Sequence, residues 1–404
     1  MGSLCFFSIL NQTNMTHTLR ISVLSLASIG CLVLAGVSSM AEEENAALSK
    51  ESSQTFSSAF NKADVLKVGN SVAEWQMENF SKMKSSSFPE SWLNGALYLG
   101  MMDWADLTGD KKIDDWLMKK FNSFKWRPAP RMYHADDVAV CQTYLDMYRK
   151  HKKETMLWPT QARTEWVVNH PSQGSMDLNY GKPSSLERWS WCDALFMAPP
   201  VYARMYALTG DRKFMDFADK EYKATYDKLF DKEENLFFRD STYFGKKEAN
   251  GKKIFWGRGN GWVVGGLAEM LKELPQDDKT YRPFYEKLFV TLCSRLLKLQ
   301  CKDGFWRASL LDPESYPSPE TSATGFITYG MAYGVEQGIL PRNQFLPAVE
   351  KGWKALVNSV GPDGKLYWVQ PVGADPKHVD KQNTEVYGVG AFLLTAAEVY
   401  KLSK

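Results

Sequence analysis

Two kinds of apolar segment alternate along the chain. Some are apolar on nearly every side, such as residues 261–268 and 388–394, which is typical of helices buried on all faces. Others are two-faced: residues 212–228 place Phe, Ala and Tyr among Asp, Lys and Glu. Alternating runs of Val, Ile and Thr are short and isolated, so the pattern predicts an almost entirely helical protein.

The two kinds of helix recur as a loose internal repeat. An apolar helix ends in Thr-Gly-Asp at 108–110 and again at 209–211. Gly suits the left-handed C-terminal position and Asp suits the cap of the next helix, so each motif predicts a tight turn between antiparallel helices. Apolar helices of this kind are expected to begin near six residues, which are Trp92, Asp137, Asp193, Asn260, Thr324 and Tyr387.

Six helical hairpins predict an all-α fold, an (α/α)6 barrel whose inner ring of apolar helices is wrapped by amphipathic ones. An open solenoid of helix pairs is the alternative, because spacing along the sequence does not establish closure. No linker rich in Pro, Gly or Ser divides the chain after residue 60. Residues 61–404 are therefore expected to form one domain, with the Glu- and Ser-rich residues 42–60 as a flexible lead-in.

The first 41 residues have the pattern of a targeting segment. Arg20 precedes the apolar run 21–37 and the small-residue stretch 38–41, which predicts a secretory signal peptide cleaved after Ala41. A retained anchor is the less favoured alternative, because the run contains Ser and Gly and acidic residues follow it. With either Met1 or Met15 as the start, we expect export across the inner membrane to the periplasm, with no membrane association after cleavage.

Composition narrows the function. The 49 Lys and Arg nearly balance the 47 Asp and Glu, which gives no general electrostatic case for nucleic acid as a partner. The 14 Trp, 18 Tyr and 22 Phe beside only 5 His favour stacking surfaces, such as those for sugars, over histidine-rich metal sites. The four cysteines after the signal segment are expected to be free and buried, and neither a metal nor a cofactor is expected. They are Cys141, Cys192, Cys293 and Cys301.

Polar residues precede the predicted inner helices. If helices alternate between rings, the loops leading into all inner helices gather at one end of the barrel, where unpaired N–H groups and positive dipole ends lie. That end is expected to hold the active site. The loops bring acids, an arginine and tryptophans there: Tyr-His-Ala-Asp-Asp at 133–137, Trp-Ser-Trp-Cys-Asp at 189–193, Phe-Trp-Gly-Arg-Gly-Asn-Gly-Trp at 255–262, and the segments 319–325 and 383–388.

These motifs resemble those of the unsaturated uronyl hydrolases. The segments WGRGNGW at 256–262, DALFMAP at 193–199 and HADD at 134–137 are similar in order and spacing to glycoside hydrolase family 105, the unsaturated rhamnogalacturonyl hydrolases, and to the related family 88. The resemblance covers essentially the whole chain after the signal segment. It implies that 61–404 is an (α/α)6 catalytic domain acting on the 4,5-unsaturated uronic acid that a polysaccharide lyase leaves at a non-reducing end.

The resemblance also implies hydration of a vinyl ether. A carboxylic acid protonates C4, positive character develops at C5, water adds there, and the hemiketal opens and expels the aglycone. By position Asp193 matches the family's catalytic acid, although the residues alone would favour a helix N-cap. Asp137 matches the second aspartate, which would orient the water or raise the pKa of Asp193, and Asp136 is the alternative.

The remaining motif residues are expected to bind the substrate. Arg258 would pair with the substrate carboxylate, with a structural salt bridge as the alternative. Trp256 and Trp262 would stack on sugar rings, although Trp262 fits a core position equally well and Asn260 fits a helix cap. Trp191, in the loop before Asp193, is grouped with them.

Two further positions bear on specificity. Many family members carry a histidine in the loop before WGRGNGW, where this chain has Arg239. A cation there would grip the carboxylate or an acidic neighbouring sugar, so the specificity is expected to differ from that for rhamnogalacturonan disaccharides. His134 would bond a sugar hydroxyl or the carboxylate, with a structural role as the alternative.

Two other classes of function stay open on the residues alone. One is an ordinary inverting glycosidase or an epimerase on the same barrel, and the other is a non-catalytic sugar-binding toroid. Epimerases on this barrel rely on several histidines, and only His134 lies at the predicted active-site end. The expected partner is an unsaturated oligosaccharide substrate, and no oligomeric state is predicted.

Overall fold

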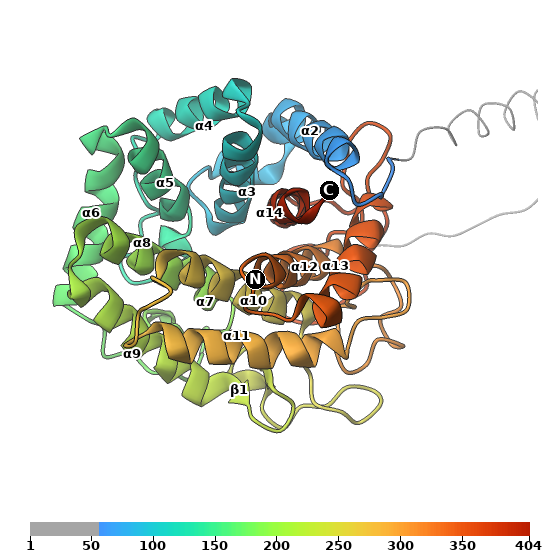
Figure 1. Cartoon of the computed structure of the whole chain (residues 1–404). Helices are drawn as coiled ribbons and strands as arrows, with labels where there is room; N and C mark the ends of the chain where they lie inside the picture. The colour runs from blue at the N-terminus through green and yellow to red at the C-terminus, as the bar shows by residue number, and fades with distance from the viewer. Residues whose placement is uncertain (1–55) are drawn as a thin grey trace, which may run out of the picture. The chain divides into compact units, whose positions relative to one another are not determined.

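The computed structural model describes residues 56–404, which form a helical barrel (Figure 1). The predicted signal segment 1–41 and most of the lead-in lie outside the described residues. Residues 56–60 lead into the first helix, and Phe56 packs against the hydrophobic core. Across 56–404, none of the helices combines the length and the apolar character that a membrane crossing requires.

Six helical segments form a closed inner ring. Neighbours along the chain pack side by side, and the last packs against the first, which rules out the open solenoid (Figure 1). The segments are α3 (Trp92–Thr108), α5 (Cys141–His151), α7 (Ala194–Met197) with α8 (Pro199–Thr209), α10 (Gly257–Glu273), α12 (Thr321–Glu336) and α14 (Val386–Leu402).

Six outer helices cover the inner ring. They are α4 (Lys111–Ser123), α6 (Glu154–Asn169), α9 (Arg212–Leu229), α11 (Arg282–Leu297), α13 (Arg342–Val357) and α2 (Lys62–Asn79). The first five each follow the inner helix they cover, as predicted. The prediction of a sixth consecutive hairpin is wrong: α14 is covered by α2, which comes from before the first inner helix. A closed ring needs a cover for every apolar inner helix, and sequence order does not dictate which segment supplies it.

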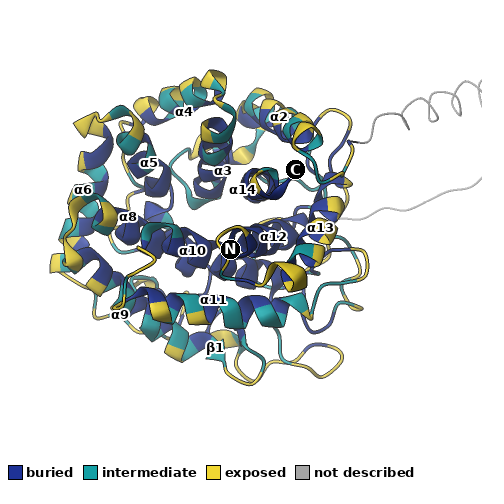
Figure 2. Cartoon of the chain, in the orientation of Figure 1, coloured by how far each residue is buried: buried dark blue, intermediate teal, exposed yellow. Residues whose placement is uncertain are grey.

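Burial follows the two rings. Nearly every residue of α10, α12 and α14 is buried, whereas the outer helices expose their outward faces (Figure 2). Glycines allow the inner helices to approach closely. A Cβ added at Gly390 would lie 2.2 Å from the backbone oxygen of Ala96, and one at Gly266 would lie 2.2 Å from that of Leu195. Any side chain at either glycine would therefore push two inner helices apart.

The Thr-Gly-Asp turns have the predicted conformation. Gly109 and Gly210 have φ angles of 70° and 71°, in the left-handed region. Asp110 and Asp211 each cap the following helix by accepting a hydrogen bond from the backbone N–H two residues on. Because the chain reverses at each turn, the inner helices all begin at one end of the barrel. We call that end the mouth and the opposite end the base.

Short elements fill the loops. Two antiparallel strands, β1 (Phe230–Asp231) and β2 (Leu236–Phe237), form a small ribbon ahead of α10. The 3₁₀ segments are η1 (Phe80–Lys82), η2 (Lys84–Ser87), η3 (Ala135–Val138), η4 (Pro183–Leu186) and η5 (Ser241–Tyr243). All four cysteines of the described chain are free; Cys301 is half-buried and the other three are buried, as predicted.

Candidate active site

Asp193 lies at the mouth in the cap position of α7, yet it does not cap the helix. Its side chain makes no hydrogen bond to the backbone N–H groups of α7. Pro199 and Pro200 begin α8 just after α7 ends, so the inner helix is broken here and Asp193 lies at an irregular opening, as predicted. Only 8% of the residue is exposed. A buried carboxyl group that serves no helix end is available for chemistry.

The surroundings of Asp193 favour its protonated form. Burial raises the pKa of Asp193, although nearby Arg239 and Arg258 and a hydrogen bond from Cys192 oppose that rise. The Cys192 thiol donates to Oδ2 over 3.4 Å, and Nε of Arg239 lies 3.7 Å from the same oxygen. Asp193 can therefore hold a proton at a higher pH than an exposed aspartate.

Asp136 is the second carboxyl group of the site. Burial, together with the charge of Asp193, raises the pKa of Asp136 to about 7, against the opposing charges of Arg131 and Arg239. Its Oδ2 also lies 3.7 Å from Nδ1 of His134. Asp136 and Asp193 therefore act on each other electrostatically, and as a pair they retain a proton close to neutral pH.

Asp137, which the sequence analysis predicts as the second catalytic aspartate, binds Arg131 with its side chain. Its Oδ2 accepts the backbone N–H of Arg131 at 2.6 Å, and its Oδ1 accepts Nε and Nη2 of the same arginine at 2.9 and 2.5 Å. Both oxygens are thus occupied in fixing the loop before η3. Successive residues of a 3₁₀ turn point about a third of a turn apart, so neighbouring aspartates face different surroundings. The structure brings Asp136, the alternative, to Asp193.

Arg239 is held beside the acid by the backbone. A bridge pairs Trp191 with Asp240, and the N–H of Cys192 donates to the carbonyl of Arg239 at 2.8 Å. Nη1 donates to the Tyr180 hydroxyl at 2.7 Å and to Asp240 at 2.8 Å. Its buried Nε has no hydrogen-bond partner among residues 56–404. A guanidinium with unused donors beside the acid is suited to a substrate carboxylate.

Arg258 is fully buried and its forked end is occupied. Nη1 donates to the carbonyl of Gln370 at 2.8 Å and Nη2 to that of Pro371 at 3.1 Å. The guanidinium lies 4.4 Å from the ring centre of Trp256 and 4.9 Å from that of Tyr387. It forms no ion pair within the described chain, so the structural salt bridge that was the alternative for Arg258 is not seen. It anchors the segment at 370–371 and places a positive charge near the mouth.

The other residues of the WGRGNGW segment also shape the site from inside. Trp256 is buried and donates its Nε1 to Gln370 at 2.9 Å. The Asn260 amide exchanges two hydrogen bonds with the backbone of Phe237, at 2.8 and 3.0 Å, and so fixes β2 to α10. Trp262 is fully buried among aromatic rings of neighbouring inner helices, in the core position that was its alternative.

His134 has a structural place next to the carboxyl pair. Its Nδ1 accepts the backbone N–H of Asp136 at 3.3 Å, which caps η3. Burial, together with the charge of nearby Arg131, lowers the pKa of His134 to about 4, so the ring is neutral at pH 7. The buried ring of Trp191 lies 4.9 Å from it. His134 thus orients Asp136 through the backbone as a neutral group.

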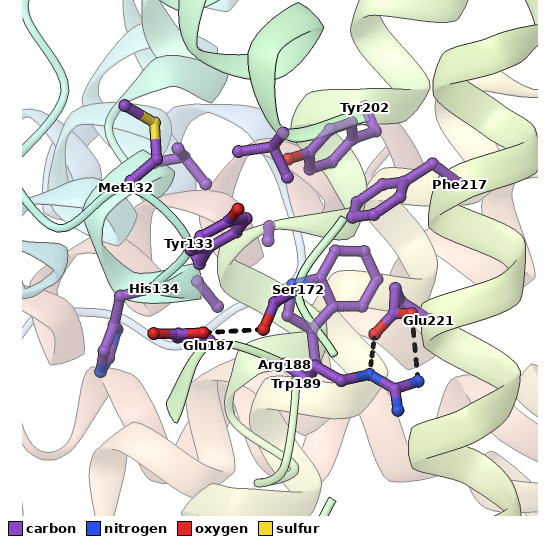
Figure 3. Close-up of a pocket in the computed structure, with 14 residues that line it drawn as sticks. Met132, Tyr133, His134, Ser172, Glu187, Arg188, Trp189, Tyr202, Phe217 and Glu221 are labelled. Carbon is purple, nitrogen blue, oxygen red and sulfur yellow. Dashed lines mark hydrogen bonds and ion pairs between the residues drawn. The ribbon is translucent and has the colours of Figure 1, made fainter. Parts of the chain in front are cut away.

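A small cavity lies behind His134, but it is too small for a sugar. Its volume is about 10 Å³, which is room for one water molecule. Figure 3 shows its polar side chains already paired, Ser172 with Glu187 and Arg188 with Glu221. This cavity is therefore not a sugar-binding site.

Two supports of the site were not found from the sequence. Gln370 lies in a loop between α13 and α14, and its side chain and carbonyl receive hydrogen bonds from Trp256 and Arg258. Arg131 binds Asp137 from the loop before η3. Neither belongs to a periodic segment or a motif, so no local pattern marks them. Among residues 56–404, no three His, Cys, Asp or Glu side chains are arranged to hold a metal ion.

Comparison with known proteins identifies the family. The family model described as Glycosyl Hydrolase Family 88 matches residues 68–403. An unsaturated 3S-rhamnoglycuronyl hydrolase of Alteromonas sp. (strain LOR) is 38% identical over 353 residues, which is 82% of this chain and 85% of that protein. A hydrolase of the same name from Formosa agariphila is 41% identical over 324 residues, 78% of this chain and 86% of that protein.

A solved structure shares the barrel. The glycosyl hydrolase family 88 protein from Bacteroides vulgatus is similar with a TM-score of 0.76 and 30% sequence identity. The likeness covers 84% of this chain and 99% of that one. The inner and outer rings described above are therefore those of a known fold.

Proposed function

The chain belongs to glycosyl hydrolase family 88, and from this premise we propose that it removes a 4,5-unsaturated uronic acid from the non-reducing end of oligosaccharides left by a polysaccharide lyase. One observation carries the proposal. Two carboxyl groups with raised pKa values, the buried Asp193 and the half-buried Asp136, lie together at the mouth beside Arg239. The names of the two curated relatives support rhamnose as the sugar to which the uronyl residue is linked.

Binding of the substrate carboxylate is assigned to Arg239. Its Nε is buried without a partner in the described chain and lies 3.7 Å from Asp193. A carboxylate bound there would place C4 and C5 of the unsaturated ring next to the acid. Arg258 contributes positive charge but has its forked end bound to carbonyls. The assignment of the carboxylate thus moves from Arg258 to Arg239.

Asp193 is assigned as the proton donor. In its protonated form it transfers the proton to C4 of the C4=C5 double bond, and the positive charge that develops at C5 is shared with the ring oxygen. Asp193 is then a carboxylate next to a cationic carbon, so their attraction stabilises the intermediate. The charge of Asp193 raises the pKa of Asp136, so the two carboxyl groups together retain a proton close to neutral pH.

Water completes the reaction. Its oxygen bonds to C5 while Asp193 accepts one of its protons, so one water molecule has been added across C4=C5 and the acid is regenerated. The product is a hemiketal at C5. Its opening breaks the bond between C5 and the ring oxygen, leaves a ketone at C5, and releases the aglycone alcohol from C1. The protein therefore needs one group that gives and takes a proton, held in a dry site.

The test uses the absorbance of the unsaturated uronyl group. Purified residues 42–404 and the Asp193→Asn variant are incubated with lyase-generated oligosaccharides from several acidic polysaccharides. Wild type should remove the chromophore, and Asp193→Asn should be slower by roughly 10³-fold, within the usual range for loss of a general acid. Unchanged absorbance with every unsaturated substrate, with sugar release from saturated ones, would contradict the proposal and favour an ordinary glycosidase.

We also propose that residues 1–41 direct export and that the mature enzyme works in the periplasm. The support is the sequence pattern of a charged start, an apolar run and small residues before Ala41. N-terminal sequencing of the protein recovered from the periplasm should begin at Glu42. Recovery of the uncleaved chain from the cytoplasm would contradict this location.

A further inference from the structure

Tyr180 is an exposed aromatic residue at the mouth to which the proposed reaction assigns no role. It is 65% exposed, yet its hydroxyl oxygen accepts a hydrogen bond from Nη1 of Arg239 at 2.7 Å. The hydroxyl makes no other hydrogen bond within residues 56–404. Arg239 in turn lies 3.7 Å from the proposed proton donor, Asp193. One side chain therefore joins this surface tyrosine to the reacting groups.

The loop that carries Tyr180 is held in place without the bond to Arg239. The hydroxyl of Ser185 accepts the backbone N–H of Asn179 at 2.9 Å and donates to the carbonyl of Asn179 at 2.8 Å. The carbonyl of Ser185 also accepts the hydroxyl of Ser190 at 2.6 Å, in the loop that leads to the acid. The backbone at Tyr180 is thus fixed by its own neighbours, and the tyrosine hydroxyl is not needed to hold the loop.

The hydrogen bonds of Arg239 show which of its donors are left for a ligand. A guanidinium has five N–H groups, two on each Nη and one on Nε. Nη1 donates to Tyr180 and, at 2.8 Å, to Asp240, so both of its hydrogens are used. Nε is buried without a partner, and Nη2 makes no hydrogen bond in the described part of the chain. The free edge of the guanidinium is therefore formed by Nε and Nη2.

This free edge can bind a carboxylate through two parallel hydrogen bonds, provided that it points at the substrate. An arginine side chain has many rotamers, and choosing one of them costs entropy. Asp240 holds Nη1 from the adjacent residue, and Tyr180 holds it from a separate loop. Two anchors on one nitrogen fix the plane of the guanidinium before the substrate arrives, which removes that cost from binding.

The two anchors differ in charge. The carboxylate of Asp240 is buried and offsets part of the positive charge of Arg239. The hydroxyl of Tyr180 is uncharged, so it orients the guanidinium and leaves the remaining positive charge to attract an anion. An acidic residue in place of Tyr180 would weaken the attraction that the site needs.

We propose that Tyr180 is a positioning residue, which aims the free edge of Arg239 at the carboxylate of the unsaturated uronyl substrate. This inference rests on the proposed function, since it requires that carboxylate at Arg239. The hydroxyl acts on binding and not on proton transfer, because Asp193 experiences the charge of Arg239 whether or not the hydroxyl is present. Loss of the hydroxyl therefore changes KM and leaves the chemical step in place.

The test removes the hydroxyl and keeps the ring. Tyr180→Phe and wild type are compared by loss of the chromophore from the unsaturated disaccharide that wild type hydrolyses best. The variant should raise KM roughly fivefold, the usual size of one lost hydrogen bond. Its kcat should stay within about twofold of wild type, and the alkaline limb of kcat/KM should not move.

Tyr148→Phe is the matched control. The hydroxyl of Tyr148 also bonds a charged side chain, that of Glu154 at 3.2 Å, but it lies in the last turn of α5, at the base. This variant loses the same group and should keep the wild-type KM and kcat.

Two comparisons show whether the hydroxyl acts through Arg239. On the methyl ester of the same substrate, which has no carboxylate, Tyr180→Phe and wild type should have equal kcat/KM. In the Arg239→Gln background, adding Tyr180→Phe should change KM by less than about twofold, because groups that act as a unit are not additive. An equal loss on acid and ester, or a second fivefold increase in the Arg239→Gln background, would overturn the inference.

Failure of the proposed function would look different. If wild type leaves the chromophore of every unsaturated substrate intact, the proposed function fails, and the role of Tyr180 fails with it. If wild type removes the chromophore but Tyr180→Phe keeps the same KM as Tyr148→Phe, the reaction stands and only the role of Tyr180 is wrong.

Discussion

Both ends of the barrel hold buried charges, but the charges are paired differently at the two ends. At the base, Arg204 on α8 pairs with Glu269 at 2.6 Å and with Asp146 at 3.1 Å. Lys272 pairs with Asp103 at 3.0 Å and with Glu269 at 3.1 Å. At the mouth, by contrast, the carboxyl groups meet each other and a cation that retains an unused donor.

The pKa values of two buried carboxyl groups express this difference. Burial alone would raise the pKa of Glu269, but the charges of Lys272 and Arg204 lower the pKa to about 2. Burial raises the pKa of Asp193, and its nearby cations do not reverse the rise. Glu269 is therefore held as an anion at the base, whereas Asp193 can hold a proton at the mouth. For these two residues the difference follows from the cations that each one meets.

The largest expected effect is at the base. Arg204→Met leaves Glu269 and Asp146 without their shared cation, so the free energy of unfolding should fall by roughly 3–5 kcal/mol. The pH dependence of kcat/KM should stay that of wild type. Urea unfolding and a pH–rate profile measure the two quantities. A shifted pH profile would mean that the base takes part in the chemistry.

The neighbouring aspartates give the next test. Asp136→Asn should lower kcat about 100-fold, because the site loses the carboxyl group whose pKa of about 7 lets the pair retain a proton near neutral pH. Asp137→Asn should act mainly on stability, lowering the free energy of unfolding by ~2 kcal/mol as the bonds to Arg131 weaken. If Asp137→Asn instead lowers kcat and Asp136→Asn lowers mainly the free energy of unfolding, Asp137 has the catalytic role.

Asp136 also predicts a pH dependence of stability. Its folded pKa of about 7 lies above the unfolded value, so ionisation of the native state costs stability as the pH rises from about 4 through 7. Asp136→Asn should therefore be more stable than wild type at pH 8, and the gain should shrink toward pH 4. Thermal melts at the two pH values measure it, and an equal gain at both would contradict the assigned burial.

The smallest expected effect concerns Arg239. Its charge lowers the pKa values of both carboxyl groups, so Arg239→Gln should move the alkaline limb of kcat/KM to higher pH. It should also raise KM roughly tenfold through loss of the carboxylate contact. Arg239→Lys retains the charge and should leave the limb near that of wild type. If the alkaline limb of kcat/KM does not shift in Arg239→Gln, Arg239 does not influence the pKa of the catalytic acid.

Local patterns in the sequence account for the fold. Apolar periodicity located all six inner segments, and the Thr-Gly-Asp motifs located two turns, because helix faces and caps depend on residues a few positions apart. The cover of α14 was missed because α2 lies at the opposite end of the sequence. Closure of a ring is a long-range property that no local pattern records.

The candidate active site could be predicted only in part, because some of its features are local in the sequence and others depend on distant residues. Asp193 was identified because the segment DALFMAP at 193–199 resembles a family motif, whereas the residues alone favoured a helix N-cap. The choice between Asp136 and Asp137 depends on side-chain direction within one turn. The state of Arg258 depends on carbonyls more than a hundred residues away in the chain. Position in the sequence identifies such residues, but their partners decide what they do.

The most direct test of vinyl-ether hydration at the mouth is the reaction in D2O, with the product read by NMR and mass spectrometry. The account predicts one deuterium bonded to carbon at C4 of the released uronic acid, delivered by Asp193, with Asp193→Asn forming little product. Release of a uronic acid that keeps its C4=C5 double bond and has no deuterium on C4 would show that the glycosidic bond is cleaved without hydration of the vinyl ether, and would contradict the mechanism.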